Sequence, residues 1–210
     1  MDSVRGGVHN TVRAARTRVD SADIRGGPVM TRATFILASA AALLVAAPAA
    51  AVLHEGATAP ALTATGALAG KTFSFNLQNE LKKGPVVLYF FPKAFTPGCN
   101  MEANAFAQHI DDFKRAGAQV FGMSGDNLDQ LKEFSVKECA GKFPVATATP
   151  ATIKAFDVAL SMNGQRNDAM TGRTSYVIAP SGRIVMVHDD LNFNEHVEKT
   201  LAAVKALRSS

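Results

Sequence analysis

Apolar residues are spaced differently along successive segments of the chain, and this spacing predicts alternating strands and helices. Residues 86–91 form a continuous apolar run rich in branched and aromatic side chains, which is typical of a central strand buried on both faces. Residues 99–115 repeat their apolar positions at helical spacing, so they predict a helix that Gly117 ends. The apolar stripe of this helix comprises Met101, Ala105, Phe106, Ile110 and Phe113.

The remaining pattern extends this alternation to the C-terminus. Residues 53–70 are rich in Ala, Thr and Gly, and we expect them to form an extended lead-in with little structure of its own. Further strands are predicted over 71–76, 118–124, 143–146, 174–179 and 183–188. Further helices are predicted to begin at Asp126 or Asn127, at Pro150, and at Asn192 or Asn194. This order predicts an α/β fold of one domain, in which helices flank a central sheet with an antiparallel end.

The first 51 residues have a different character and predict an export signal. Residues 33–51 are uncharged and rich in alanine, and a short basic stretch precedes them. This is the pattern of a secretory signal peptide over residues 30–51, cleaved near Ala51, and it predicts a periplasmic or secreted location for the domain 52–210. A membrane anchor is the alternative, because the apolar run approaches the length of a spanning helix.

Residues 1–29 are rich in Arg and Gly and show no apolar periodicity. They are either a non-native extension upstream of a translation start at Met30, or a genuine, disordered part of the leader. The first 51 residues hold six arginines against three aspartates, whereas residues 52–210 hold sixteen basic and fifteen acidic side chains. The net charge of +4 therefore describes mainly the leader. It predicts neither nucleic-acid binding nor, after cleavage of the leader, stable association with a membrane.

The cysteine and histidine content limits the candidate chemistry. The 210 residues include two cysteines, Cys99 and Cys139, which are too few for a disulfide scaffold or a structural zinc site. His54, His188 and His196 are too scattered to form a ligand set with Cys99, and no metal-binding spacing of Cys and His occurs. We therefore expect no metal and no cofactor.

Cys99 comes shortly after a predicted strand and stands at the start of a predicted helix, behind the turn of Thr96, Pro97 and Gly98. A helix N-terminus presents unpaired N–H groups and the positive end of a dipole, which stabilise a thiolate, the reactive form of cysteine. Thr96 can direct its hydroxyl to the same place. The alternative is an inert core cysteine, a common state of free thiols. The setting favours a thiolate pocket for a small polar substrate.

The segment around Cys99 also carries a family pattern. Pro92, Thr96, Cys99 and Glu102 stand at the spacing P-x-x-x-T-x-x-C-x-x-E, which resembles the active-site pattern of the peroxiredoxins. The Thr-Pro-Gly-Cys form is similar to the Q-type group, the bacterioferritin comigratory proteins, of the alkyl hydroperoxide reductase/thiol-specific antioxidant family. The resemblance extends over residues 54–208. It implies a thioredoxin-like fold and a peroxidase that reduces hydrogen peroxide and organic hydroperoxides.

The same resemblance implies roles for individual residues. Cys99 would attack the peroxide and become a sulfenic acid, Thr96 would hold the peroxide oxygens, and Pro92 would shield the pocket. Residues 173–185 resemble the family's arginine-bearing strand, so Arg173 would stabilise the thiolate and the transition state. The alternative for Arg173 is an exposed salt bridge at a strand start.

The return of the sulfenic acid to a thiol is a separate question. Many Q-type members carry a second cysteine five residues after the first, but here that position is Asn104. Cys139, about three residues beyond a second site used in the group, is therefore expected to resolve the sulfenic acid as a Cys99–Cys139 disulfide. A thioredoxin-like protein would then reduce it. An inert Cys139 in a one-Cys enzyme, or a static disulfide, remains an alternative. The Q-type resemblance implies a monomer.

An exported thiol-disulfide oxidoreductase is the competing class of function. Such an enzyme normally needs C-x-x-C, because the nearby second thiol resolves the mixed disulfide. The positions three residues before and after Cys99 are Thr96 and Glu102, which argues against this class.

Overall fold

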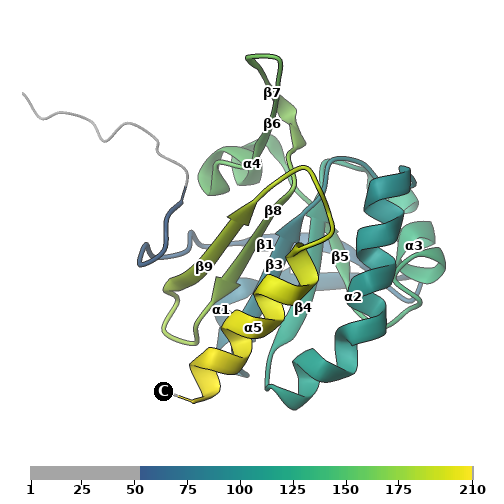
Figure 1. The fold of residues 1–210 in the computed structure, drawn as a ribbon. Coiled ribbons are helices and arrows are strands. Elements are labelled where there is room, and N and C mark those ends of the chain that lie inside the picture. The colour runs from purple at the N-terminus through teal and green to yellow at the C-terminus, as the bar shows by residue number, and fades with distance from the viewer. Residues whose placement is uncertain (1–52, 210) are drawn as a thin grey trace, which may run out of the picture. The chain divides into compact units, whose positions relative to one another are not determined.

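The computed structural model describes residues 53–209, so the predicted leader 30–51 and the segment 1–29 lie outside the described residues. Within the described part, seven strands form one mixed sheet in the order β2-β1-β5-β4-β3-β8-β9, and a two-stranded hairpin, β6–β7, projects from one end (Figure 1). The sheet comprises β1 (Thr63–Leu68), β2 (Lys71–Asn76), β3 (Val86–Phe90), β4 (Gln119–Ser124), β5 (Val145–Thr147), β8 (Thr174–Ile178) and β9 (Ile184–Asp189). The hairpin comprises β6 (Ala159–Met162) and β7 (Gln165–Thr171). The helices are α1 (Leu77–Leu81), α2 (Pro97–Arg115), α3 (Leu128–Lys137), α4 (Pro150–Phe156) and α5 (His196–Arg208).

Strand β3 is buried throughout because helices cover both faces of the sheet. Side chains alternate across a strand, so Val87 and Tyr89 enter one core, while Val86, Leu88 and Phe90 enter the other. Helices α2, α3 and α5 supply side chains to the first core, and α1 and α4 to the second. The predicted central strand, the mixed sheet and the flanking helices are confirmed.

The pairing of the strands brings distant segments to one end of the sheet. Strand β8 is antiparallel to β3 and pairs Thr174 with Phe90, so β8 begins where β3 ends. Strand β9 is antiparallel to β8 and pairs Asp189 with Thr174, so β9 ends at the same place. Three parts of the chain therefore lie at the same end of the sheet: the start of α2 with Cys99, Arg173 just before β8, and the start of α5.

Four elements differ from the sequence expectation: β1, β6, β7 and α1. Residues 53–70 are not merely an extended lead-in, because β1 pairs with β2 along its whole length. Its small residues have a packing reason: a Cβ at Gly66 would lie 2.0 Å from the backbone oxygen of Val145. The β6–β7 hairpin is mostly exposed, so it lacks the apolar alternation that predicts a strand. Helix α1 has five residues and is too short for a periodic signal.

One helix start and one apolar position also differ from the sequence expectation. Met101 is 49% exposed and does not join the buried stripe of α2. Asn127 caps α3 as predicted, through a 2.9 Å bond from the N–H of Gln130. Helix α5 begins at His196 without a side-chain cap, so the prediction of an asparagine cap is wrong. The side chain of Asn192 accepts from the N–H of Asn194 instead, within the loop before α5.

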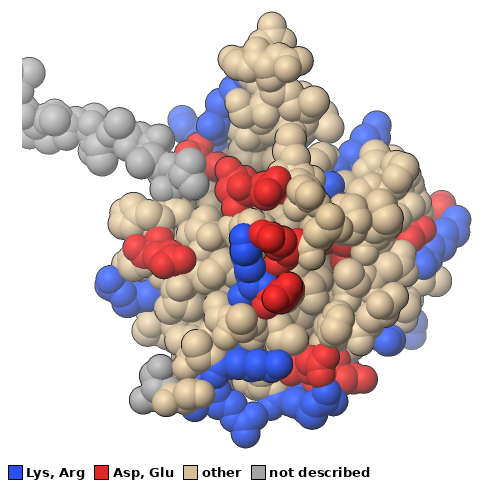
Figure 2. Space-filling view, viewed as in Figure 1, with Lys and Arg blue, Asp and Glu red and all other residues tan. Residues whose placement is uncertain are grey.

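Charged side chains of both signs are interspersed on the face shown in Figure 2, and Lys and Arg gather at its lower end, where α2 and α5 end. The last turns of these helices carry Lys114, Arg115, Lys205 and Arg208. Positive charge there opposes the negative end of each helix dipole, so this gathering has a local structural reason. Within residues 53–209, no helix is both long enough and apolar enough to cross a membrane.

Candidate active site

Cys99 lies in the first turn of α2 and is 1% exposed. Helix α2 begins at Pro97, whose missing N–H is no loss at this position. Thr96 occupies the N-cap but makes no side-chain capping bond, because its hydroxyl donates to the carbonyl of Lys93 at 2.9 Å. The N–H groups of the first turn therefore receive no cap from Thr96, and the positive end of the helix dipole adjoins the thiol.

Arg173 places its guanidinium against the sulfur. Its Nη2 donates to Cys99 Sγ at 3.5 Å, its Nη1 donates to Glu102 Oε2 in a close contact, and its Nε donates to the carbonyl of Leu191 at 2.8 Å. The residue is 5% exposed, so the alternative of an exposed salt bridge is wrong. These bonds fix the plane of the guanidinium beside the thiol.

Gly98 explains how the backbone comes so close to Arg173. A Cβ on Gly98 would lie 3.3 Å from Arg173 Nη2 and 3.9 Å from the ring of Phe193. The first of these is a tight contact, so a larger residue would push on the guanidinium. The glycine of the Thr-Pro-Gly-Cys sequence thus has a steric role beside its position in the turn.

The loop before Cys99 is held from β4 and α3. Asp126 accepts from the N–H of Ala94 at 2.6 Å and from the hydroxyl of Ser124 at 2.9 Å, so it fixes the loop and does not cap α3. Phe95 has a φ of 65°, in the left-handed region, and its ring packs edge-on against Phe134 of α3 with centroids 5.4 Å apart. The loop therefore reaches Cys99 in a conformation that its neighbours impose.

Pro92 and Thr96 lie in this loop, both partly buried. Pro92 follows the end of β3 by two residues, and Thr96 stands immediately before α2. The structure thus brings four of the predicted site residues to the same end of the sheet: Pro92, Thr96, Cys99 and Arg173.

Cys139 lies just after the C-cap of α3 and is 0% exposed. Both cysteines are free thiols here, so the predicted disulfide is not formed in this structure. Burial, with a smaller contribution from Glu138, raises the pKa of the Cys139 thiol. Cys139 is thus a protonated thiol in the same apolar core that contains Cys99.

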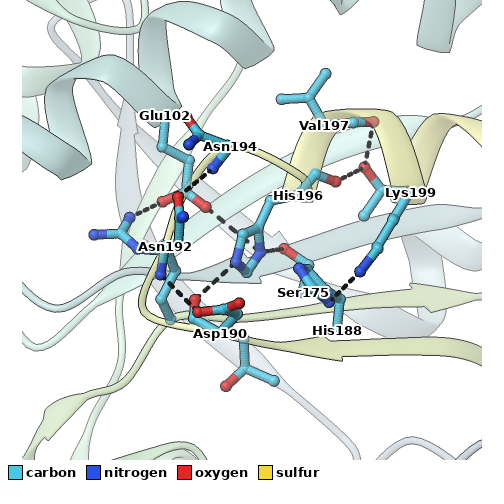
Figure 3. Close-up of polar contacts among 12 residues, drawn as sticks. Glu102, Ser175, His188, Asp190, Asn192, Asn194, His196, Val197 and Lys199 are labelled. Carbon is cyan, nitrogen blue, oxygen red and sulfur yellow. Dashed lines mark hydrogen bonds and ion pairs between the residues drawn. The ribbon is translucent and has the colours of Figure 1, made fainter.

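Glu102 and His196 form a polar network that sequence reasoning did not identify (Figure 3). Glu102 is 0% exposed, and burial raises its pKa to about 8 although Arg173 opposes this shift. His196 lies 3.7 Å from Glu102, 2.8 Å from Ser175 and 2.9 Å from the carbonyl of Asp190. The sequence could have indicated Glu102 by its spacing, because a residue three positions after Cys99 lies on the same face of the helix as Cys99.

The arrangement can hold and use a reactive thiolate. A helix N-terminus and a buried guanidinium both stabilise negative charge on Cys99 and on oxygen atoms that develop charge beside it. Among residues 53–209, no three His, Cys, Asp or Glu side chains gather in a way that could hold a metal ion. The fold and this site together define a thiol-based redox enzyme.

Comparisons with known proteins identify the family. The sequence pattern of the AhpC/TSA family matches residues 56–187. The chain is 32% identical to the chloroplastic peroxiredoxin Q of Suaeda salsa over 156 residues. These aligned residues cover 74% of this chain and 69% of that protein. The chain therefore belongs to the AhpC/TSA family, within its Q-type or bacterioferritin comigratory peroxiredoxins.

Two solved structures confirm the thioredoxin-like fold. The peroxidoxin BcpB of Mycobacterium tuberculosis superimposes with a TM-score of 0.64 at 26% identity, covering 73% of this chain and 97% of that one. The bacterioferritin comigratory protein of Xanthomonas campestris, described with alkyl peroxide reduction activity, gives a TM-score of 0.60 at 29% identity, covering 70% and 92%.

Proposed function

We propose that the chain reduces hydrogen peroxide and organic hydroperoxides through a sulfenic acid at Cys99. The thiolate attacks the terminal peroxide oxygen, the O–O bond breaks, and the departing alkoxide or hydroxide takes up a proton to leave as alcohol or water. Arg173 and the first-turn N–H groups of α2 stabilise the charge on these oxygens. The activity described for the Xanthomonas campestris relative supports the same substrate class.

The observation that carries this proposal is the 3.5 Å bond from Arg173 Nη2 to Cys99 Sγ at the start of α2. An inert core thiol has no need of a buried cation, and burying a guanidinium is costly unless an anion accompanies it. A thiolate that can donate its electrons to a peroxide supplies such an anion.

We propose that Cys139 begins the return of the Cys99 sulfenic acid to a thiol. Its thiol would attack the sulfur of the sulfenic acid, forming the Cys99–Cys139 disulfide and releasing water. A thioredoxin-like dithiol would then reduce the disulfide and itself become oxidised. We also propose that residues 30–51 direct export of the chain. The thioredoxin-like reductant must then act in the compartment to which the chain is exported.

The test compares the full chain with its Cys99→Ser and Cys139→Ser variants in peroxide consumption. With dithiothreitol as reductant, wild type and Cys139→Ser are expected to consume peroxide, whereas Cys99→Ser is not. With a thioredoxin-like donor, only the wild type is expected to turn over. Full activity of Cys99→Ser would show that the proposed function is wrong.

Peptide mapping after one equivalent of peroxide separates the two resolving schemes. If Cys139 resolves the sulfenic acid, the map should contain a pair of peptides linked by a Cys99–Cys139 disulfide. A one-Cys enzyme would leave Cys139 open to alkylation after unfolding while Cys99 is oxidised. Because Cys139 is buried and its pKa is raised, the Cys99–Cys139 disulfide is expected to form only after a local unwinding of the helix that carries Cys99.

A further inference from the structure

Glu102 and His196 form a second polar layer behind Arg173, and both are fully buried. Glu102 Oε2 accepts from Arg173, whereas Glu102 Oε1 is buried and has no hydrogen-bond partner. His196 Nδ1 lies 3.7 Å from this unpartnered oxygen (Figure 3). A buried polar atom without a partner is uncommon and needs a reason.

The protonation of the His196 ring follows from its partners. Nε2 lies 2.9 Å from the carbonyl oxygen of Asp190, which can only accept, so Nε2 carries a proton. Nδ1 lies 2.8 Å from the hydroxyl of Ser175. A neutral His196 accepts that hydroxyl proton with the one lone pair of Nδ1, so it has no proton to offer Glu102 Oε1. An ionised Glu102 would then leave a charged oxygen without a donor in an apolar core, and one proton held by Oε1, or by Nδ1 with the Ser175 hydroxyl turned to accept, removes the conflict.

We propose that Glu102 and His196 hold one proton between them, and that this proton keeps the charge of Arg173 directed to Cys99. With the proton in place, the buried charges are the guanidinium and the thiolate, which balance. Without it, the Glu102 carboxylate competes with the thiolate for the same guanidinium. His196 is therefore a positioning residue for the peroxidase reaction, and this inference rests on the proposed function.

Other ionisable groups surround the pair without bonding to the unpartnered oxygen. They are Arg173, Cys99, Tyr89, His188, Asp189, Asp190, Glu195 and Lys199. The rings of His188 and His196 lie 4.5 Å apart, and Lys199 lies 3.4 Å from His188 and 2.5 Å from Glu195. Burial raises the pKa of Tyr89 well above its ordinary value, so Tyr89 stays neutral. Tyr89 therefore exchanges no proton with Glu102 near neutral pH.

The expected effect of pH has a definite direction. Burial raises the pKa of Glu102 to about 8, and burial lowers the pKa of His196 to about 4. The shared proton therefore resides on Glu102 at neutral pH and is lost on the alkaline side. The rate of Cys99 oxidation should fall as Glu102 ionises.

The experiment measures the rate at which hydrogen peroxide oxidises Cys99 in the full chain, by quenched flow and mass spectrometry, from acid to alkaline pH. The wild-type rate is expected to fall with a midpoint near 8. In Glu102→Gln, which keeps the shape but cannot ionise, this fall is expected to disappear. In His196→Gln the midpoint is expected to move to lower pH by about one unit, because the amide N–H can donate to the carboxylate.

A matched control and a second measurement keep the test decisive. His109 is exposed and pairs with Asp112 at 3.0 Å, so His109→Gln is expected to leave the midpoint unchanged. A purely structural role for His196 would lower the rate at every pH without moving the midpoint, and would overturn the proposal. If Glu102→Gln fails to fold, infrared spectra of the wild type must lose a protonated carboxylic acid band at the kinetic midpoint, and absence of that band would also overturn it.

The two proposals fail in different ways. If peroxide does not oxidise Cys99 in the wild type, the proposed function is wrong whatever the state of Glu102. If Cys99 is oxidised and the alkaline fall persists unchanged in Glu102→Gln, the shared proton is wrong and the peroxidase function stands.

Discussion

At the scale of single residues, one guanidinium joins the parts of the site. Arg173 bonds to the sulfur of Cys99, to Glu102 and to the carbonyl of Leu191. The sequence was sufficient to place Cys99 at the start of a helix that follows a buried strand, where a thiol has a physical reason to react. It was not sufficient for His196, because the contact with Glu102 joins residues that only the strand pairing and the loop after β9 bring together.

Replacement of Arg173 tests whether the oxidation of Cys99 depends on the planar arrangement of the guanidinium N–H groups as well as on the positive charge. Arg173→Lys keeps the charge but cannot serve three acceptors in one plane, so the rate constant for Cys99 oxidation is expected to fall about 100-fold. The measurement is the single-turnover oxidation of Cys99 by hydrogen peroxide. Arg183→Lys, at an exposed arginine of the β8–β9 turn, is the matched control and should keep the wild-type rate. A rate in Arg173→Lys equal to wild type would mean that charge alone suffices.

At the scale of elements, the sequence predicted the buried strands and long helices because their apolar spacing reflects two covered faces. It missed β1 and the β6–β7 hairpin, where small or exposed residues carry no such pattern. Helix α2 is tied to the end of α3 by a bond that periodicity could not reveal either. Asn104, at the position where many Q-type members have a second cysteine, donates to Glu138 at 2.9 Å and to the carbonyl of Asn100 at 2.8 Å.

This link joins the helix of Cys99 to the residue that precedes Cys139, so its removal should ease their approach. Asn104→Ala is expected to form the Cys99–Cys139 disulfide faster after peroxide addition, while the free energy of unfolding falls by at most about 1 kcal/mol. Non-reducing peptide maps at successive times measure the rate, and urea unfolding measures the stability. Glu138→Ala removes the other partner and should act in the same direction. Slower disulfide formation in both variants would contradict this role of the link.

At the scale of the whole molecule, two buried ionisable groups make stability depend on pH in opposite directions. The pKa of Glu102 rises from 4.5 to about 8 on folding, so its contribution is present below 4.5 and is lost as pH rises through 8. The pKa of His196 falls from 6.5 to about 4, so its contribution is present above 6.5 and is lost as pH falls through 4. Between 4.5 and 6.5 the two slopes oppose each other.

Urea unfolding of the reduced protein at a series of pH values tests this opposition. Relative to wild type, Glu102→Gln should lose the decline in stability toward pH 8, whereas His196→Gln should lose the rise in stability toward pH 6.5. Both variants are expected to be less stable than wild type at some pH, so the slopes and not the absolute values decide. His109→Gln should give a curve parallel to that of the wild type. Parallel curves for all three variants would contradict the buried titrations.

The exposure of Met101 has a practical consequence for any study of this enzyme with its substrate. Met101 is about half exposed, two residues beyond the reactive cysteine, and Met162 on the projecting hairpin is exposed to a similar extent. Peroxide converts accessible methionine to the sulfoxide, which adds one oxygen, the same mass that a sulfenic acid adds. Intact-protein mass alone would therefore confuse surface damage with turnover. Fragment spectra that separate Met101 from Cys99 are needed to count catalytic events.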